Sequence, residues 1–334
     1  MIIPQTFSIA AVQASPVFLD RDATIQKACD LIAEAADLGA SLAVFPEAFV
    51  PAYPVWVWYI PSGKTHDLRS LYAELLENAI DIPGPATDLL CAAAKKAGIA
   101  VAIGVNERNT EGSRSTLYNS ILYIGPNGDV PGRHRKLVPT TGERLVWGQG
   151  DGSDLGVHSL PFGRVGGLIC WENYMPLARY TLYARGVELY VAPTWDRGEP
   201  WISTMRHIAK EGRCYVVGCC SAMRLDDLPD RLAFKTTYLS DSAQWLNPGL
   251  SVIVDPDGKI VAGPLEKEEG ILIAEVDRST ITGSRFQLDT AGHYARPDVF
   301  DLRVATGAKP FLREVDSIDE GERDAHGMDG SLPT

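Results

Sequence analysis

Short apolar stretches rich in β-branched and aromatic residues alternate with helix-period stretches along most of the sequence. The β-rich stretches are FSIAAVQ, LAVFPE, AVAIGVN, YNSILYIG, VGGLIC, ELYVAP, CYVVGCC, SVIVDPDG and ILIAEVD. The helix-period stretches lie near residues 21–38, 67–79, 86–97, 177–185 and 201–212. A sheet has to cover its apolar face with another layer, so this alternation is typical of layered α/β folds. We therefore predict an α/β architecture.

Turn signals join some of these strands as hairpins. Pro126-Asn127-Gly128 follows the β-rich stretch YNSILYIG, and Pro256-Asp257-Gly258 ends the stretch SVIVDPDG; such tripeptides favour tight turns between neighbouring strands. Hairpins require antiparallel neighbours, whereas helical crossovers favour parallel ones. We therefore expect mixed sheets.

The domain organisation follows from what the chain lacks. Its 334 residues show no repeat of fixed period and no Pro/Ser-rich linker, so residues 1–305 are predicted to form a single domain. Residues 306–334 are rich in charged, small and glycine residues, a composition that cannot bury enough apolar surface to offset the entropy of ordering. This C-terminal tail is predicted to be loose or to be held by a partner subunit in assembly.

The charge balance restricts the partners. With 31 basic and 43 acidic residues the net charge is −12, which disfavours nucleic acid and anionic membranes as partners. The most apolar window, SLAVFPEAFVPAYPVWVWYI, carries Glu47 and three prolines, so it is a poor membrane span. The first residues lack a basic segment of the kind that starts a signal peptide, and a cytoplasmic location is expected.

The six cysteines are irregularly spaced and form no CxxC pair. This pattern favours reduced thiols over a zinc site or a disulfide framework. The glycine-rich WGQGDGSDLG lacks both the lysine of a phosphate loop and the GxGxxG order, so nucleotide binding is not expected. We predict no metal and no cofactor.

One carboxylate follows an apolar strand in FPEAFVPAYP. Glu47 is flanked there by aromatic and small residues. It could cap a loop or pair on the surface, but its apolar flanks favour a pocket acid with a raised pKa.

A basic cluster precedes a second carboxylate in GRHRKLVPTTGERLVWGQGDG, which contains Lys136 and Glu143. Such a cluster is usually a solvated face. The neighbouring Leu-Val runs suggest instead that the backbone turns inward and directs at least one cation into a cleft.

A cysteine ends the apolar run VGGLIC, and the helix-like segment opened by Pro176 comes shortly after it. A buried, unreactive thiol is the commoner fate of a cysteine after a strand. A nucleophile at a strand-to-helix turn would face backbone N–H groups, and a helix N-terminus would favour the thiolate of Cys170. No histidine forms a recognised Cys/His signature, so a carboxylate could serve as the base, with an ammonium stabilising the developing charge.

Taken together, FPEAF, HRKLVPT and CWEN, in that order, resemble the nitrilase superfamily of carbon–nitrogen hydrolases. The resemblance extends over roughly residues 5–300. It implies that Glu47 is a general base, Lys136 a charge stabiliser and Cys170 the nucleophile. It also implies that Glu143 is a second glutamate that helps to position them.

Further segments resemble the nitrilase branch more than the amidase or carbamoylase branches; they are EAFVPAYP, ERLVWGQGDG, CWENYMPLARY, APTWD, STMRHIAKEGRCYVVGCC and DTAGHYARPDVF. The resemblance implies a four-layer α-β-β-α sandwich with mixed sheets. It also implies hydrolysis of a small-molecule nitrile by water, through a thioimidate and a thioester, to an acid and ammonia. Its substrate-binding residues would be Tyr53, Trp147 and Trp195, with the backbone N–H of Trp171 facing the reacting nitrogen. A homo-oligomer is implied, with a dimer as building block that can extend into a spiral or filament.

Three other functions remain open at this stage. The same residues could hydrolyse an amide or carbamoyl group, or hydrate a nitrile only as far as the amide, as cyanide hydratases do. A non-catalytic assembly protein that kept the fold is a remote third possibility. The products formed from a reactive nitrile distinguish all three from a nitrilase.

Overall fold

The computed structural model describes residues 5–239, 244–308 and 312. The strands are β1 (Thr6–Gln13), β2 (Ala40–Val44), β3 (Ala100–Arg108), β4 (Leu117–Ile124), β5 (Gly132–Arg135), β6 (His158–Leu160), β7 (Gly163–Gly167), β8 (Leu189–Thr194), β9 (Tyr215–Cys220), β10 (Ala222–Arg224), β11 (Trp245–Val254), β12 (Ile260–Glu266) and β13 (Gly270–Asp277). The α-helices are α1 (Arg21–Asp37), α2 (Thr65–Asn78), α3 (Pro85–Ala97), α4 (Pro176–Ala184), α5 (Glu199–Gly212), α6 (Ala233–Tyr238) and α7 (Arg278–Arg285). Short 3₁₀ helices include η1 (Val55–Trp58), η2 (Thr141–Leu145) and η4 (Cys170–Tyr174).

The strands form two mixed sheets. One has the order β13-β1-β2-β3-β4-β5, and the other β10-β11-β9-β8-β7-β6 with β12 paired to β11. In the first sheet β1, β2 and β3 are parallel, and in the second β7, β8 and β9 are parallel, while the remaining pairs are antiparallel. The hairpins predicted at residues 126–128 and 256–258 join β4 to β5 and β11 to β12. The prediction of mixed sheets is confirmed.

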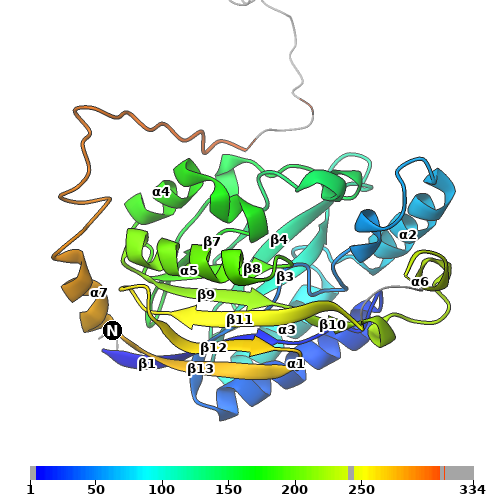
Figure 1. Ribbon diagram of the computed structural model, residues 1–334, viewed down its shortest axis with the longest axis horizontal. Coiled ribbons are helices and arrows are strands. Elements are labelled where there is room, and N and C mark those ends of the chain that lie inside the picture. The colour runs from blue at the N-terminus through cyan, green and yellow to red at the C-terminus, as the bar shows by residue number, and fades with distance from the viewer. Residues whose placement is uncertain (1–4, 240–243, 309–311, 313–334) are drawn as a thin grey trace, which may run out of the picture.

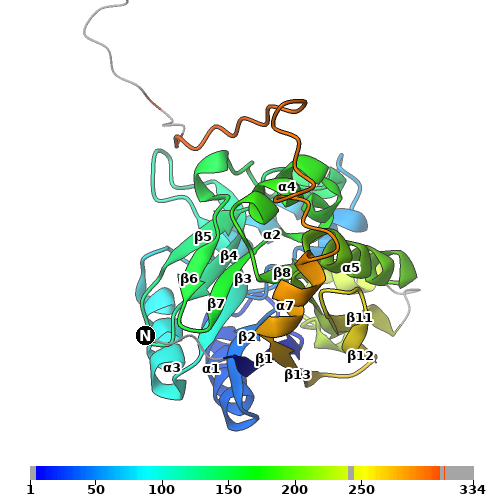
Figure 2. The same cartoon turned by 90° about the vertical axis from the view of Figure 1, so that its left-hand side faces the viewer.

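Three apolar layers hold four structural layers together. Along β1, Ile9 and Ala11 point into the space between the sheets, whereas Ala10 and Val12 point toward α1 and α3. On the second sheet, the outward residues pack under α4 and α5. The alternation arises because successive side chains of a strand point to opposite faces. Figures 1 and 2 show the resulting α-β-β-α sandwich, as predicted, with α1 and α3 on one side and α4 and α5 on the other.

A further apolar cluster lies at one end of the sandwich. It joins the residues of η1 to α2, to α6 and to the loop containing Trp147. Figure 1 shows α2 and α6 side by side at this end, where the Tyr238 hydroxyl donates a hydrogen bond to Asp67 at 3.2 Å. These elements form a cap over the carboxyl ends of β2, β3, β7 and β8, which is where open α/β sheets commonly bind ligands.

The structure differs from the sequence predictions in several elements. The strand predicted to run to Cys170 ends at Gly167, and the next residues turn into η4. The predicted stretches do not include β5, β6, β10, β12, α6 or α7. Most of these elements are short, and β12 is largely exposed and weakly patterned. The predicted tail lies outside the described residues, apart from 306–308 and 312. No helix of the described part is both long and apolar enough to cross a bilayer.

Candidate active site

The site lies at the capped end of the sandwich, where loops follow β2, β5, β7 and β8. Glu47 comes three residues after β2 and is 1% exposed. Its Oε1 accepts hydrogen bonds from Lys136 Nζ at 2.8 Å and from Asn119 Nδ2 at 2.7 Å, and its Oε2 accepts the backbone N–H of Trp195 at 2.7 Å. The carboxylate therefore receives donors from three different segments, which fix its orientation.

The backbone beside Glu47 is held against β3 at very close range. A Cβ at Gly104 would lie 2.1 Å from the Pro46 carbonyl oxygen and 2.5 Å from the Ala48 nitrogen. Ala48 itself has a φ of 49°, in the left-handed region that non-glycine residues seldom occupy. Only glycine at position 104 leaves room for this turn.

Lys136 immediately follows β5 and is fully buried with two carboxylates. Its Nζ lies 2.8 Å from Glu47 and 2.7 Å from Glu143 Oε2. Glu143 is held in turn by the backbone N–H of Thr140 at 2.7 Å and by the Tyr53 hydroxyl at 2.7 Å. The predicted cation does point inward, and it stabilises two carboxylates that could not both remain ionised without it.

Cys170 opens η4 in a conformation that is costly for a side chain. Its φ is 53°, and a non-glycine residue in this region carries a strain of about 1–2 kcal/mol. Two side-chain groups of Asn173 and Glu172 hold the turn. Asn173 Nδ2 donates to the Leu168 and Cys170 carbonyls at 3.0 and 2.8 Å, and Glu172 Oε2 accepts the Ile169 N–H at 2.8 Å.

The groups around Cys170 shift the pKa of its thiol in opposite directions. Burial raises the pKa of this thiol, and the Glu47 and Glu143 carboxylates add to the rise, which Lys136 and a hydrogen bond with Thr194 only partly oppose. Two carboxylates and one ammonium already leave one excess negative charge, and a thiolate would add another. The surroundings of Cys170 therefore oppose the thiolate that a helix N-terminus would favour, and a base that accepts the thiol proton would assist attack by the sulfur.

Glu47 is suited to that task by its surroundings. Burial raises its pKa, Lys136 opposes the rise, and Glu143 adds to it. The pKa of Lys136 is raised because the carboxylates outweigh the effect of burial. The lysine is therefore a permanent cation, whereas the glutamate is a carboxylate with increased proton affinity.

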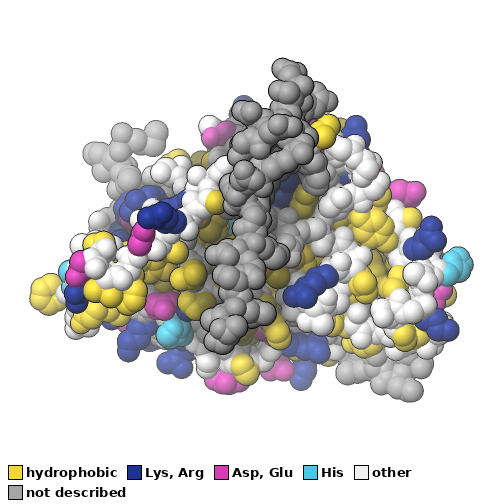
Figure 3. Space-filling view, turned by 90° about the horizontal axis from the view of Figure 1, so that it is seen from above, with side chains coloured by type: hydrophobic (Ala, Val, Ile, Leu, Met, Phe, Trp, Pro, Cys, Tyr) yellow, Lys and Arg dark blue, Asp and Glu magenta, His cyan; other side chains and the backbone are white. Residues whose placement is uncertain are grey.

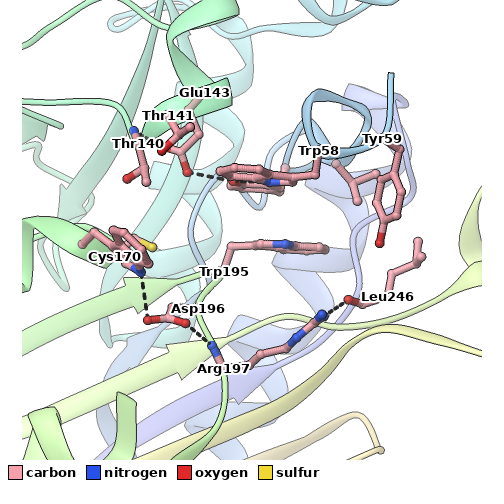
Figure 4. Close-up of a pocket in the computed structure, with 13 residues that line it drawn as sticks. Trp58, Tyr59, Thr140, Thr141, Glu143, Cys170, Trp195, Asp196, Arg197 and Leu246 are labelled. Atoms are coloured by element: carbon pink, nitrogen blue, oxygen red, sulfur yellow. Dashed lines mark hydrogen bonds between the residues drawn. The ribbon is translucent and has the colours of Figure 1, made fainter. Parts of the chain in front are cut away.

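A cavity of about 300 Å³ is lined by Cys170 and Glu143, whereas Glu47 and Lys136 are not among the residues that line it. Figure 4 shows Cys170 beside it, with Thr140 and Glu143 from one loop and Trp195 from another. The Trp195 ring stacks on Tyr53 with centroids 4.4 Å apart and an interplanar angle of 1°. Trp58 also lines the cavity and donates its indole N–H to the Tyr53 hydroxyl at 3.0 Å.

The two remaining aromatic residues predicted for the pocket occupy different places. Trp171 lies at the cavity rim, 51% exposed, with its indole N–H bonded to Asp196 at 2.9 Å. Trp147 lies behind the wall: its ring meets the Tyr53 ring edge-on at 5.6 Å, and Lys136 Nζ lies 5.9 Å from its ring centroid. Its indole N–H bonds to Asn106 at 2.9 Å. Trp147 thus supports the residues that line the cavity.

Several residues of the site were not predicted from the sequence. Asn119 is a buried amide inside the apolar stretch of β4, and a polar residue covered on both faces of a strand was the available signal. Trp58 and Thr194 carried no comparable signal, because only the folding of the loops brings them to the cavity and to Cys170. Within the described residues, no group of three or more His, Cys, Asp or Glu is arranged to hold a metal ion.

Comparisons with known proteins show the family of the chain and its fold. The profile of the family described as carbon-nitrogen hydrolase matches residues 8–286. An aliphatic nitrilase of Sinorhizobium fredii is 47% identical over 300 residues, which cover 89% of this chain and 95% of that protein. Nitrilase 2 of Arabidopsis thaliana is 39% identical over 320 residues, covering 94% and 93%. The solved structure of the C. elegans NitFhit protein has a TM-score of 0.70 at 20% identity, covering 93% of this chain and 70% of that one.

Proposed function

Since the chain belongs to the nitrilase branch of the carbon–nitrogen hydrolase family, and is thereby a hydrolase of carbon–nitrogen bonds, we propose that it converts an organic nitrile and water to a carboxylic acid and ammonia. Glu47 acts as the general base, Cys170 as the nucleophile and Lys136 as the stabiliser of developing negative charge. Glu143 positions Lys136. The observation that carries the proposal is the buried Glu47–Lys136–Glu143 network, whose Glu143 lines the same cavity as Cys170.

The first half of the reaction forms a covalent bond. Glu47 accepts the thiol proton as the Cys170 sulfur bonds to the nitrile carbon, and one π bond of the nitrile opens toward nitrogen. Returning the proton to that nitrogen gives a thioimidate. Proton transfer is coupled to attack because an isolated thiolate would be a second uncompensated negative charge in this cavity.

The second half consumes two waters. Glu47 activates the first, which adds to the thioimidate carbon, and the tetrahedral intermediate expels ammonia to leave a thioester. The second water adds to the thioester, and its collapse releases the acid and restores the thiol. If the first tetrahedral intermediate expels the sulfur instead of ammonia, the product is an amide.

Charge develops first on nitrogen and later on oxygen at one place in the cavity. Lys136 and the backbone N–H of Trp171 are the proposed donors to it, and loss of one such donor typically costs about 10²- to 10³-fold in rate. The geometry supports a fixed lysine for this role, because its Nζ is held by carboxylates at 2.7 and 2.8 Å. A preorganised donor needs no rearrangement during the reaction.

A panel of aliphatic, arylaliphatic and aromatic nitriles, with acid, amide and ammonia all quantified, tests the proposal. We expect acid and ammonia from at least one class, and no turnover after Cys170→Ala. Cys214→Ala is the matched control, because Cys214 is also a buried thiol but precedes β9 at the far end of the sheet. An active Cys170→Ala protein, or an unaltered protein with no activity on any nitrile, would overturn the proposal.

The same panel separates the alternative functions. Activity on amides with none on the matching nitriles would identify an amidase or carbamoyl hydrolase. Amide as the main product would identify a hydratase of the cyanide-hydratase kind.

The remaining expectations concern assembly and location. We propose a cytoplasmic location and a homo-oligomer. The homo-oligomer is supported by exposed hydrophobic side chains, and Figure 3 shows groups of such side chains on the face seen from above. Leu177, Tyr294 and Phe300 are 66%, 60% and 75% exposed and line one hollow of the surface. Sedimentation velocity is expected to give a species larger than a 36.3 kDa monomer, and a monomer at micromolar concentration would refute this part.

A further inference from the structure

One buried carboxylate bridges the two loops that carry the lysine and the cysteine. Glu172 Oε1 accepts the backbone N–H of Leu137 at 2.6 Å, and its Oε2 accepts that of Ile169 at 2.8 Å. Leu137 is the residue after Lys136, and Ile169 is the residue before Cys170. A single side chain thus holds the backbone directly beside two of the proposed catalytic groups.

The two loops come from different sheets. Lys136 follows β5 at the edge of the first sheet, and Cys170 follows β7 in the second. Their relative position would otherwise depend on how the two sheets stack. A link through Glu172 fixes their separation locally, within two residues of each group.

His134 completes the link from the strand that leads to the lysine. Its Nε2 lies 3.0 Å and 3.2 Å from the two oxygens of Glu172, so the ring donates to the carboxylate. His134 and Glu172 are each 1% exposed. Burial by itself lowers the pKa of His134, but the adjacent carboxylate more than offsets this effect and the pKa is raised.

We propose that Glu172 and His134 form a positioning pair that sets the separation of the Lys136 and Cys170 loops in the reactive arrangement. This inference rests on the proposed nitrile hydrolysis and adds two residues to it that touch neither substrate nor reacting atoms. The strained φ of Cys170 fits the role, since a left-handed residue persists only when its surroundings over-determine it.

The chemistry of the pair predicts different effects of similar substitutions. Three donors converge on Glu172, so Glu172→Gln turns an amide N–H₂ toward at least one of them and breaks the bridge. His134→Gln can still donate to the carboxylate through its amide, whereas His134→Leu leaves a buried carboxylate without that donor. The two histidine variants therefore separate loss of the hydrogen bond from loss of the ring.

A carboxylate with similar partners but far from the cavity provides the control. Glu188 Oε2 accepts the Arg164 backbone N–H at 2.9 Å, and its Oε1 pairs with Arg278 at 2.6 Å. It precedes β8, whereas the site lies beyond the other end of that strand. Glu188→Gln should lower the melting temperature without changing the kinetics.

The test is steady-state kinetics on the best nitrile of the panel, together with thermal melting of each variant. For Glu172→Gln and His134→Leu we expect kcat to fall by roughly 10- to 100-fold with KM nearly unchanged, because small misplacements of reacting groups reduce rates on this scale. His134→Gln should recover most of the lost kcat. Parental kcat in Glu172→Gln, or a loss no larger than in Glu188→Gln at equal melting temperature, would overturn the proposal.

Two further outcomes are also decisive. If Glu172→Gln does not fold, equal kcat in His134→Leu and His134→Gln refutes the pair. If the unaltered protein hydrolyses no nitrile, the proposed function fails, but alkylation of Cys170 by iodoacetamide still tests the positioning, with mass spectrometry identifying the modified residue. The alkylation rate should then change in Glu172→Gln and not in Glu188→Gln; equal rates in both would refute it.

Discussion

Replacing Lys136 with methionine keeps the volume of the side chain and removes its charge. The Lys136 side chain is 0% exposed, and its Nζ lies 2.8 Å from Glu47 and 2.7 Å from Glu143. Removing one partner of a buried ion pair costs about 3–5 kcal/mol, because the other charge stays in a low-dielectric site. Here two carboxylates lose the same partner, so we expect a loss at the upper end of this range at pH 8. One of the two carboxyl groups can take up a proton and become neutral, so the loss in the free energy of unfolding is less than twice that of a single pair.

The size of this loss should depend on pH with a definite sign. In Lys136→Met, burial and mutual repulsion raise the pKa of at least one carboxyl above that of the unfolded chain, where glutamate has a pKa of 4.5. Above that pH the folded variant binds more protons than the unfolded one, so its stability falls as pH rises toward the raised pKa. One proton contributes at most about 1.4 kcal/mol per pH unit.

Urea or guanidinium unfolding of the parent and the variant at pH 5, 6, 7 and 8 measures the effect. The deficit of the variant should be small at pH 5 and should grow toward pH 8. Lys27→Met is the matched control, because its 2.9 Å pair with Glu269 is partly exposed, and such pairs contribute at most about 1 kcal/mol. A Lys136→Met deficit below that value at pH 8, or one that does not shrink at pH 5, would refute the compensating role of the ammonium.

Three other predictions concern the loops and the thiol. Gly104→Ala should lower kcat at least tenfold, roughly the cost of a small misplacement of Glu47; Gly63→Ala, where an added Cβ meets nothing within 4 Å, should not, and equal kcat in both would exclude the steric explanation. Tyr53→Phe should destabilise the protein by about 1.5–3 kcal/mol, the usual range for a hydrogen bond to a charged group, and thermal melting that matches the parent would contradict this. Without substrate, the raised pKa of Cys170 should make the rate of its alkylation by iodoacetamide increase about tenfold per pH unit from pH 6 to 9. Mass spectrometry of the modified peptide measures this rate. A rate that is already constant below pH 7 would indicate a resting thiolate.

Burial and the neighbouring carboxylates raise the pKa of the Cys170 thiol. In the proposed mechanism, the reactivity of this thiol depends on Glu47 and Lys136, which come from two other segments of the chain and are hydrogen-bonded to each other. The proposed positioning pair has a similar logic, since a strained nucleophile is useful only if its base and cation remain at a constant separation. In this proposal, the positions of the loops set the distances between the charged groups and the thiol.

Much of this protein can be predicted from its residues in chain order. The apolar runs that become β1, β4 and β9 predict buried strands, and their alternation with helix-period segments predicts a layered α/β fold. The stacking of two sheets is implied only by the resemblance to the nitrilase superfamily. The local signals of Glu47, Lys136 and Cys170 depend on their immediate neighbours, so short motifs identify them. Gly104, by contrast, shows no local signal, because the backbone that leaves no room for a side chain there belongs to a loop that is distant in the sequence.

Only the tertiary structure determines which residues that are distant in the sequence come into contact. Asn119 and Trp195 reach Glu47 from different sheets, and Glu172 meets Leu137 only because the two sheets stack at a particular register. The pKa of Cys170 likewise rises through burial and through carboxylates that are remote in the chain. Periodicity reports whether a side chain leaves water, whereas partners, distances and protonation depend on which surfaces then meet. That is a property of the packed sandwich and not of any single segment.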